Sequence, residues 1–355
     1  MSLNLSKVAL LLAGLWGGTN PVPLSNRNLI VDGGFDIWNT TVSSTLATAG
    51  GYTQAVMHLA GCGTGGAGTF TQTDLRPSGP AYSESGRQLA FVHNQTTGAT
   101  GTVAARTAGF ILHRIEHVAR TAGRSATYQI RLWSTGANIT IPSVIASISY
   151  GTGGAPSPGV NFDKAVNWVV TSTPKKFSVR LDVPASTGKT FGTNGDDYLA
   201  VGIWLPPGVT FVLVGTEAQL ELSDPNSSPA TDGTGGAPTT IEYRGEQAEL
   251  ARVSRYWQYL VGYIFGVGAV QSATTLYFEV KYAPKRAIPA LTPVGGFSIF
   301  TPQTGTISAS GGVSNGSAST DSAFMTATAS GMVGGQAGWC SNVGNAGAII
   351  VDARL

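Results

Sequence analysis

The segment Thr239–Leu260, TTIEYRGEQAELARVSRYWQYL, decides the predicted architecture because it holds the one convincing helix pattern between two long β regions. Apolar side chains recur in it at i, i+3, i+7 and i+10, the spacing of one face of an amphipathic helix. These residues are Leu250, Val253, Trp257 and Leu260. We predict a helix that buries Leu250 and Trp257 between two modules, since a helix placed in this way commonly packs across the end of a sandwich.

The regions on both sides of this segment alternate apolar and polar residues with a period of two, as half-buried strands do. Tyr128, Ile130 and Leu132 share one face of a predicted strand, and Trp133 lies on the opposite face. Turn residues follow at the short intervals typical of sandwiches and barrels. We therefore predict an all-β protein: a jelly-roll-like antiparallel β-sandwich over residues 28–238, joined by the helix to a smaller C-terminal β module within 239–355.

Composition favours a surface-exposed β protein over a cytosolic enzyme. Charged residues make up 11% of the 355 residues, against about 25% in typical soluble proteins. Glycine is abundant at 48 residues, as turn-rich β proteins require. The net charge of +2 comes without a cluster of lysines and arginines, so the sequence does not predict nucleic-acid binding. Cys62 and Cys340 form no disulfide or metal framework, and we expect two free thiols.

Residues 1–27 are predicted to form an N-terminal attachment arm. Its apolar run VALLLAGLW, residues 8–16, is shorter than the roughly 20 residues that a membrane-spanning helix needs. The side chains expected to contact a partner surface are Leu5, Val8, Leu12, Leu15 and Trp16. The alternative for this run is the apolar part of a secretory signal peptide.

Several motifs together resemble a known group of proteins. The opening string NLIVDGGFDIW, residues 28–38, is followed by RIE at 114–116 and by GKTFGTNGDDYL at 188–199. The segment around the predicted helix contributes Glu242, Arg244, Glu249, Leu250, Arg255 and Tyr256. This series resembles tail-fibre and virion-surface proteins of tailed bacteriophages, which carry a carbohydrate-binding-like β-sandwich and a C-terminal β module. Asp32 departs from the asparagine usual in the opening string.

The resemblance implies a non-enzymatic structural subunit of a virion: a fibre, receptor-binding or surface-decoration protein. It implies a homotrimer that is assembled in the host cytoplasm and exposed on the particle, and that contacts other virion proteins through the arm. Host cell-surface polysaccharide would be bound weakly and multivalently. Two alternatives stay open: a secreted bacterial carbohydrate-binding or adhesion protein, and a glycan-degrading tailspike.

The candidate ligand residues are aromatic or lie in turns. Trp133 is expected to be exposed and to stack on a sugar, with Asp197 and Tyr198 in a neighbouring ligand-binding loop. No cofactor is expected apart from a structural calcium ion, for which Asp36 and Glu217 are the candidate ligands because calcium prefers oxygen donors. The string HRIEH, residues 113–117, matches an inverted zinc-peptidase motif, but its β context argues against a metal site.

Overall fold

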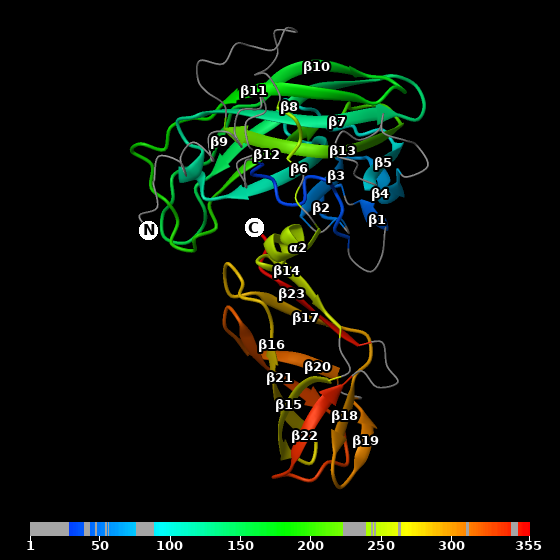
Figure 1. Cartoon of the computed structure of the whole chain (residues 1–355), viewed down its shortest axis with the longest axis vertical. Helices are drawn as coiled ribbons and strands as arrows, with labels where there is room; N and C mark the ends of the chain where they lie inside the picture. Colours follow the sequence, from blue (N-terminus) through cyan, green and yellow to red (C-terminus); the bar gives the residue numbers. More distant parts are fainter. Residues whose placement is uncertain are drawn as a thin grey trace, which may run out of the picture.

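The computed structural model describes residues 28–38, 43–46, 48–53, 55, 57–75, 89–222, 239–242, 244, 246–261, 264–309, 312–341 and 347–355. Nearly all regular structure in these ranges is antiparallel strand (Figure 1), which confirms the predicted all-β class. The helices in the described part are α2 (Glu246–Ser254) and the short 3-10 helix η3 (Val118–Arg120). The predicted arm and the linker at 224–238 lie outside the described residues.

Two sheets form the sandwich. The first has the strand order β1-β4-β5-β13-β7-β11 and the second has the order β10-β8-β12-β6-β3-β2, with β9 paired to β8. The first sheet comprises β1 (Ser43–Leu46), β4 (Ala67–Asp74), β5 (Leu89–Thr97), β13 (Phe211–Leu222), β7 (Ser125–Ser134) and β11 (Lys175–Asp182). The second comprises β10 (Lys164–Val170), β8 (Ile139–Ser149), β12 (Tyr198–Trp204), β6 (Ala108–Glu116), β3 (His58–Gly63), β2 (Gly51–Tyr52) and β9 (Val160–Asn161).

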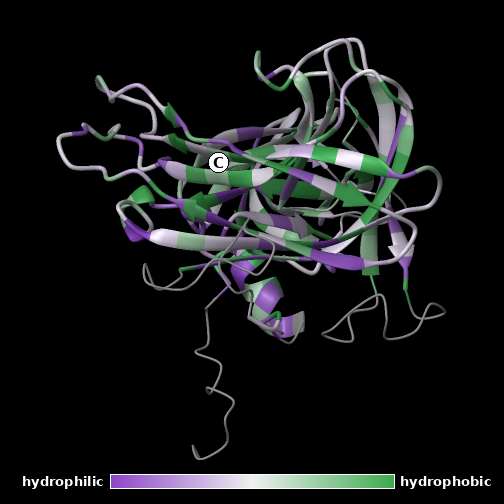
Figure 2. Cartoon of the chain, turned by 90° about the horizontal axis from the view of Figure 1, so that it is seen from above, coloured by the Kyte–Doolittle hydropathy of each residue, from purple (hydrophilic) through white to green (hydrophobic). Residues whose placement is uncertain are grey.

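The chain crosses repeatedly between the two sheets, from β5 to β6, to β7 and to β8, which gives the jelly-roll-like connectivity. The space between the sheets is a continuous apolar core in which the predicted inward face of β7 is fully buried. Viewed from above, hydrophobic and hydrophilic residues alternate in colour along many of the strands (Figure 2). Cys62 lies in the sandwich core and Cys340 in the second module; both are free thiols, as predicted.

The C-terminal module combines a three-stranded sheet, β14-β23-β17, with a seven-stranded sheet, β19-β18-β22-β15-β16-β21-β20. The small sheet comprises β14 (Trp257–Leu260), β23 (Ala348–Asp352) and β17 (Ala290–Val294). The large sheet comprises β19 (Gly305–Ser308), β18 (Ser298–Thr301), β22 (Ala337–Ser341), β15 (Ile264–Ser272), β16 (Thr275–Lys281), β21 (Ser322–Thr328) and β20 (Gly312–Ala318). Leu276, Phe278 and Val280 face its core.

The helix between the modules is shorter than the sequence predicts and buries only part of the predicted apolar stripe. It ends at Ser254, and Trp257 begins strand β14, which pairs with β23. Leu250 is 37% exposed, so its predicted burial is wrong, whereas Val253 of the same stripe is buried, together with the carboxylate of Glu249. The pairing of β14 with β23 supplies hydrogen bonds along a whole strand, and this tertiary contact overrides the local helical period. Trp257 is buried as predicted.

Candidate functional site

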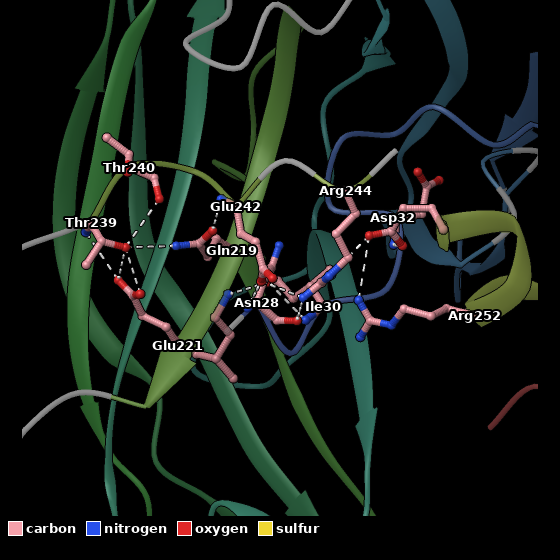
Figure 3. A network of polar contacts seen from close by, with 12 residues as sticks. Asn28, Ile30, Asp32, Gln219, Glu221, Thr239, Thr240, Glu242, Arg244 and Arg252 are labelled. Carbon is pink, nitrogen blue, oxygen red and sulfur yellow. Dashed lines mark hydrogen bonds and ion pairs between the residues drawn. The ribbon is translucent and has the colours of Figure 1, made fainter. Parts of the chain in front are cut away.

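The first described residues of the chain are fixed to the last strand of the sandwich by the side chain of Asn28 (Figure 3). Its Oδ1 atom accepts hydrogen bonds from the backbone N–H groups of Ile30 at 3.0 Å and Leu220 at 3.1 Å. Its Nδ2 atom donates to the carbonyl of Ala218 at 3.0 Å. An asparagine is needed here because one side chain must both donate and accept.

A buried arginine joins this opening segment to helix α2. Arg244 donates to the carbonyl of Asn28 at 2.6 Å, to Glu242 at 2.6 Å and to Glu249 at 3.0 Å. The other oxygen of Glu249 accepts the backbone N–H of Asp32 at 3.0 Å. Five residues of the motifs that carry the family resemblance therefore meet in one buried network, which we call the junction network, and their contacts are structural: Asn28, Asp32, Glu242, Arg244 and Glu249.

Polar contacts to the sandwich hold the segment that enters this network. The Oε1 atom of Gln219 accepts the backbone N–H of Glu242 at 2.7 Å. Thr239 donates its hydroxyl to Glu221 at 2.7 Å (Figure 3). The carbonyl of Thr239 accepts from Gln129 at 3.2 Å. The entry to the C-terminal module is thus fixed against β13 and β7, and the direction in which α2 leaves the sandwich is set.

The opposite side of the junction is apolar. Ile37 and Met57 from the sandwich pack against Val253, Tyr256 and Trp257 from α2 and β14. Burying such side chains between the modules contributes roughly 25 cal/mol for each Å² of apolar surface removed from water. The junction therefore combines an apolar contact with directional hydrogen bonds, and both modules contribute to each.

Further ion pairs cross the junction from strand β6. The buried carboxylate of Glu116 pairs with Arg255 at 3.1 Å and with Arg286 at 3.3 Å. Arg114 donates to the carbonyl of Leu355, and its guanidinium lies 4.6 Å from the ring centroid of Tyr198. The last residue of the sequence is consequently seated on the sandwich beside β6.

A cleft with a volume of about 460 Å³ opens beside these contacts, within the range of roughly 300–1,000 Å³ usual for ligand sites. We call it the junction cleft. It is lined by Leu29, Val31, Arg114, Ile115, Glu116, Arg120, Arg252, Arg255 and Tyr256. Residues of the sandwich form one wall and residues of α2 and the following turn form the other, so the cleft exists only where the two modules meet.

The charge of the junction cleft is unbalanced, with four arginines against one glutamate. Burial, and next the nearby Arg244, lower the pKa of Arg252. Its Nη1 atom lies 3.6 Å from Glu249, which is an ion-pair distance but too long for a hydrogen bond. Burial raises the pKa of Tyr256 to about 12, so the phenol stays neutral and is able to donate a hydrogen bond at physiological pH.

Three buried histidines lie in the sandwich, outside the cleft. The Nε2 atom of His58 donates to the carbonyl of Asp32 at 2.9 Å, so its Nδ1 atom accepts from Nδ1 of His113 at 2.9 Å. Burial lowers the pKa of His58 to about 3 and that of His93 to about 4. Burial and the neighbouring His58 hold the pKa of His113 well below 6.5. These rings are neutral core residues.

The zinc-peptidase pattern at residues 113–117 does not have the helical geometry of that motif. His113 points into the sandwich core from strand β6, while His117 follows that strand with a left-handed backbone at φ 65° and a partly exposed side chain. The two rings therefore do not share a helical face, which the zinc motif requires.

The prediction that Trp133 is an exposed sugar platform is wrong. Trp133 is 5% exposed and packs with Leu75, Ala90 and Val214 on the outer face of the first sheet. The sequence places Trp133 correctly on the face opposite Tyr128, but Leu75, the residue after β4, packs on that face. Trp133 also precedes the start of β8, whereas the other two candidate ligand residues, Asp197 and Tyr198, lie beside its end.

Asp197 and Tyr198 lie close to the junction cleft without lining it. The Asp197 carboxylate accepts the backbone N–H of Val118 at 2.7 Å and lies 3.8 Å from Nδ1 of His117. Tyr198 supports the guanidinium of Arg114, a cleft residue. Both residues position the loop that follows β6, and their contact with a ligand stays a prediction.

The structural calcium ion proposed at Asp36 and Glu217 stays a prediction. Glu217 sits in a bulge of β13 at φ 56° and pairs with the buried Arg131 at 2.9 Å. Among the described residues, no three or more His, Cys, Asp or Glu side chains gather as metal ligands do. Calcium takes six to eight oxygen ligands, so backbone carbonyl or amide oxygens would have to complete a site at Asp36 and Glu217.

The sequence did not single out the four cleft arginines as a group. Arg114, Arg252 and Arg255 lie in or next to the quoted motifs, but they approach one another only after the sandwich and α2 have packed. The only signal available was the repeated arginine on α2 and the turn after it, at positions 252 and 255. In the part of the chain that the structure covers, no helix has the length and apolarity needed to cross a membrane.

No family model and no curated protein sequence matches the chain. Among solved structures, it is similar to a carbohydrate-binding module described under "CBM4 structure and function", with a TM-score of 0.27, 11% identity, and coverage of 44% of this chain and 87% of that one. The enzymatically active domain of tailspike protein 4 from bacteriophage CBA120 gives a TM-score of 0.30 and 12% identity, covering 56% of this chain and 22% of that one.

The tandem CBM22 domains of Xyn10C from Paenibacillus barcinonensis give a TM-score of 0.31 and 10% identity, covering 94% of this chain and 99% of that one. Because none of these three TM-scores reaches 0.5, the likenesses carry no argument about function. The case for a function rests on the chain's own residues.

Proposed function

We propose that the protein is a non-catalytic, glycan-binding subunit of a tailed-phage virion, and that its ligand occupies the junction cleft. The observation that carries this proposal is the composition of the cleft. Leu29, Val31 and the ring of Tyr256 offer an apolar and aromatic surface to a sugar, and the surrounding arginines offer hydrogen-bond donors. The cleft replaces the surface around Trp133 as the proposed sugar site.

The small number of carboxyl groups in the junction cleft supports binding of a glycan without its hydrolysis. Glycosidases of the usual kind place two carboxyl groups on either side of the scissile bond. Among the described residues, Glu116 is the one acidic residue that lines the cleft, and it is paired with Arg255 and Arg286. A carboxylate held by two guanidinium groups is poorly suited to act as a general acid.

The proposed setting is the surface of a virion assembled in the host cytoplasm. Three copies would form a homotrimer, and the arm at residues 1–27 would attach the trimer to other virion proteins. Host cell-surface polysaccharide would be bound weakly at each cleft, and several clefts acting together would raise the avidity. The sequence motifs quoted above support this setting, and a resident metal ion or other cofactor is not part of the proposal.

Filling the cleft tests its role in glycan binding. Val31→Trp introduces a large ring into the cleft, and Val169→Trp introduces the same ring at an exposed position on β10. Each variant is displayed in many copies on beads and presented with host surface polysaccharide. We expect Val31→Trp to abolish retention and Val169→Trp to retain the polysaccharide as the wild type does. Equal retention by the two variants would show that sugars bind elsewhere.

Two further measurements separate the remaining functions. A reducing-end assay on polysaccharide incubated with the protein should show no increase over buffer; an increase would indicate a glycan-degrading tailspike. N-terminal sequencing of the native protein should find the apolar run at residues 8–16 intact. Removal of that run would favour the secreted bacterial carbohydrate-binding or adhesion protein.

A further inference from the structure

We infer that the junction cleft recognises an acidic group on its glycan, an oxyanion such as the carboxylate of an acidic sugar or a sulfate or phosphate ester. This inference rests on the proposed function and adds the chemical class of the ligand. It is carried by the surplus of positive charge in the cleft and by the exposed Arg120, which makes no ion pair with any other described residue.

The surplus of charge is local to this cleft. The whole chain carries a net charge of only +2, yet four arginines and one glutamate line a single cavity. Like charges held this close repel one another, and the repulsion grows where water is partly excluded. A bound oxyanion would remove that repulsion, whereas a neutral sugar would not.

The arginines have hydrogen-bonding capacity left over. Arg120 is exposed at the end of η3 and makes no ion pair with any other described residue. The Nε atom of Arg114 and the Nη1 atom of Arg252 are buried, and neither finds a hydrogen-bond acceptor among the described residues. Because these two atoms are shielded from solvent, the exposed guanidinium of Arg120 is the group that an oxygen-rich ligand in the cleft would reach most directly.

The glutamates near the cleft do not neutralise it. Glu116 is shared between Arg255 and Arg286, and Glu249 is shared between Arg244 and Arg252. Each of these carboxylates therefore faces two guanidinium groups. The planar guanidinium matches the geometry of carboxylate, sulfate and phosphate oxygens, which identifies an oxyanion as the complementary group.

The apolar part of the same cavity indicates that the ligand is larger than a bare ion. Leu29 and Val31 lie in the cavity lining together with Tyr256, which adds a neutral hydroxyl. A free inorganic anion would make no apolar contact with these residues, but a sugar ring that carries the anionic group would. We therefore expect inorganic sulfate to bind weakly and an acidic saccharide to bind more tightly.

A charge-matched pair of variants tests the site. Arg120→Gln removes a cleft arginine that holds no other part of the structure together. Arg124→Gln removes an exposed arginine four residues along the chain that does not line the cleft. The first readout is the melting temperature of the full chain as sodium chloride is replaced by sodium sulfate at constant ionic strength. Sulfate stabilises folded proteins generally, so the difference between the two variants reports the site.

We expect the sulfate-dependent rise in melting temperature to be smaller in Arg120→Gln than in the wild type, and unchanged in Arg124→Gln. The second readout is binding of the multivalent protein to polygalacturonate, to its carboxyl-reduced form, to dextran sulfate and to dextran. At least one anionic polymer should bind about tenfold or more tightly than its neutral counterpart, the size expected for a hydrogen bond to a charged group. Arg120→Gln should lose most of that preference.

The outcomes separate this inference from the proposed function. If neutral and anionic polymers bind equally, or if both variants weaken binding equally, the acidic-group inference is wrong while glycan binding stands. If no polymer and no host glycan binds, but sulfate still distinguishes the two variants, the cleft is an anion site and the glycan-binding function is wrong. If sulfate also fails to distinguish them, both ideas are overturned. The pair of polymers that shows the preference tells a carboxylate from a sulfate ester.

Discussion

The sandwich and the C-terminal module bury different kinds of residue. The interior of the sandwich contains His58, His93 and His113, each almost fully buried. The interior of the C-terminal module is built around apolar side chains such as Phe278 and Met325. All four histidines of the sequence lie between positions 58 and 117. Two modules of one chain should therefore respond differently to acid, and the junction between them should respond to the loss of either its charged or its apolar half.

Acidification should give the largest effect and should act on the sandwich. The pKa of each buried histidine is lower in the folded protein than its unfolded value of 6.5. The unfolded chain therefore binds more protons as the pH falls below about 6.5, and stability that is complete above this pH is lost progressively. At about pH 5 each histidine costs roughly 2 kcal/mol, or about 6 kcal/mol for the three together.

Hydrogen exchange measured between about pH 7.5 and pH 5, and corrected for intrinsic rates, checks this difference. Opening free energies in β3, β5 and β6 should fall with pH because these strands carry the three histidines. Those in β16 and β21 of the C-terminal module should change little. Equal losses in both modules would mean that the histidines do not govern the acid response.

The charged half of the junction should give the next largest effect. Arg244→Ala leaves the buried carboxylates of Glu242 and Glu249 without their shared guanidinium. Breaking a buried ion pair by removing one partner costs about 3–5 kcal/mol, and we expect the free energy of unfolding to fall by about 4 kcal/mol. Denaturant unfolding measures it, with the exposed Arg124→Ala as a control expected to stay within about 0.5 kcal/mol. Equal effects of the two variants would contradict a structural role for the junction network.

The apolar half of the junction should contribute somewhat less. Trp257 is buried against Val253 and Tyr256 and against the sandwich residues Ile37 and Met57. Trp257→Ala should lower the free energy of unfolding by about 3 kcal/mol, at the lower end of the range for large core aromatics because the ring lies at a module boundary. Trp257→Phe, which keeps an aromatic ring, should lose less than half as much. A loss below about 1 kcal/mol for Trp257→Ala would show that the modules do not depend on this contact.

The sequence was sufficient to predict the strands, but not which segments pack over their outer faces. A period of two identified β7 and placed Tyr128, Ile130 and Leu132 correctly in the core. The same period placed Trp133 on the other face but could not show that Leu75 lies over that face. The alternation of apolar and polar residues predicts which side chains share a face of a strand. It does not predict which segments, distant in the sequence, pack over that face.

The candidate site was less predictable for the same reason. Glu116 and Arg255 each occur in a quoted motif, but their ion pair forms only when α2 packs beside β6. The helix itself was predicted with the wrong length, because the run from Leu250 to Leu260 satisfies a helical period on paper while its last four residues pair with β23. Local pattern was overridden by a strand partner from the end of the chain.

The smallest expected effect tests which residues of α2 are buried. Leu250 is exposed, whereas Val253, three residues later, is buried in the apolar half of the junction. Leu250→Ala should change the free energy of unfolding by no more than about 0.5 kcal/mol. Val253→Ala removes two buried methyl groups and should cost about 2 kcal/mol.

Denaturant unfolding of both variants gives the comparison directly. If α2 used the face that the helical period predicts, with Leu250 turned inward, Leu250→Ala would be the more damaging change because leucine loses more buried carbon than valine. A larger loss for Val253→Ala places the buried face along Glu249 and Val253, next to Arg252. Burial of Val253 sets the orientation of the helix. The same orientation directs Arg252 and Arg255 toward the cleft, so this stability measurement also tests the geometry of the proposed binding site.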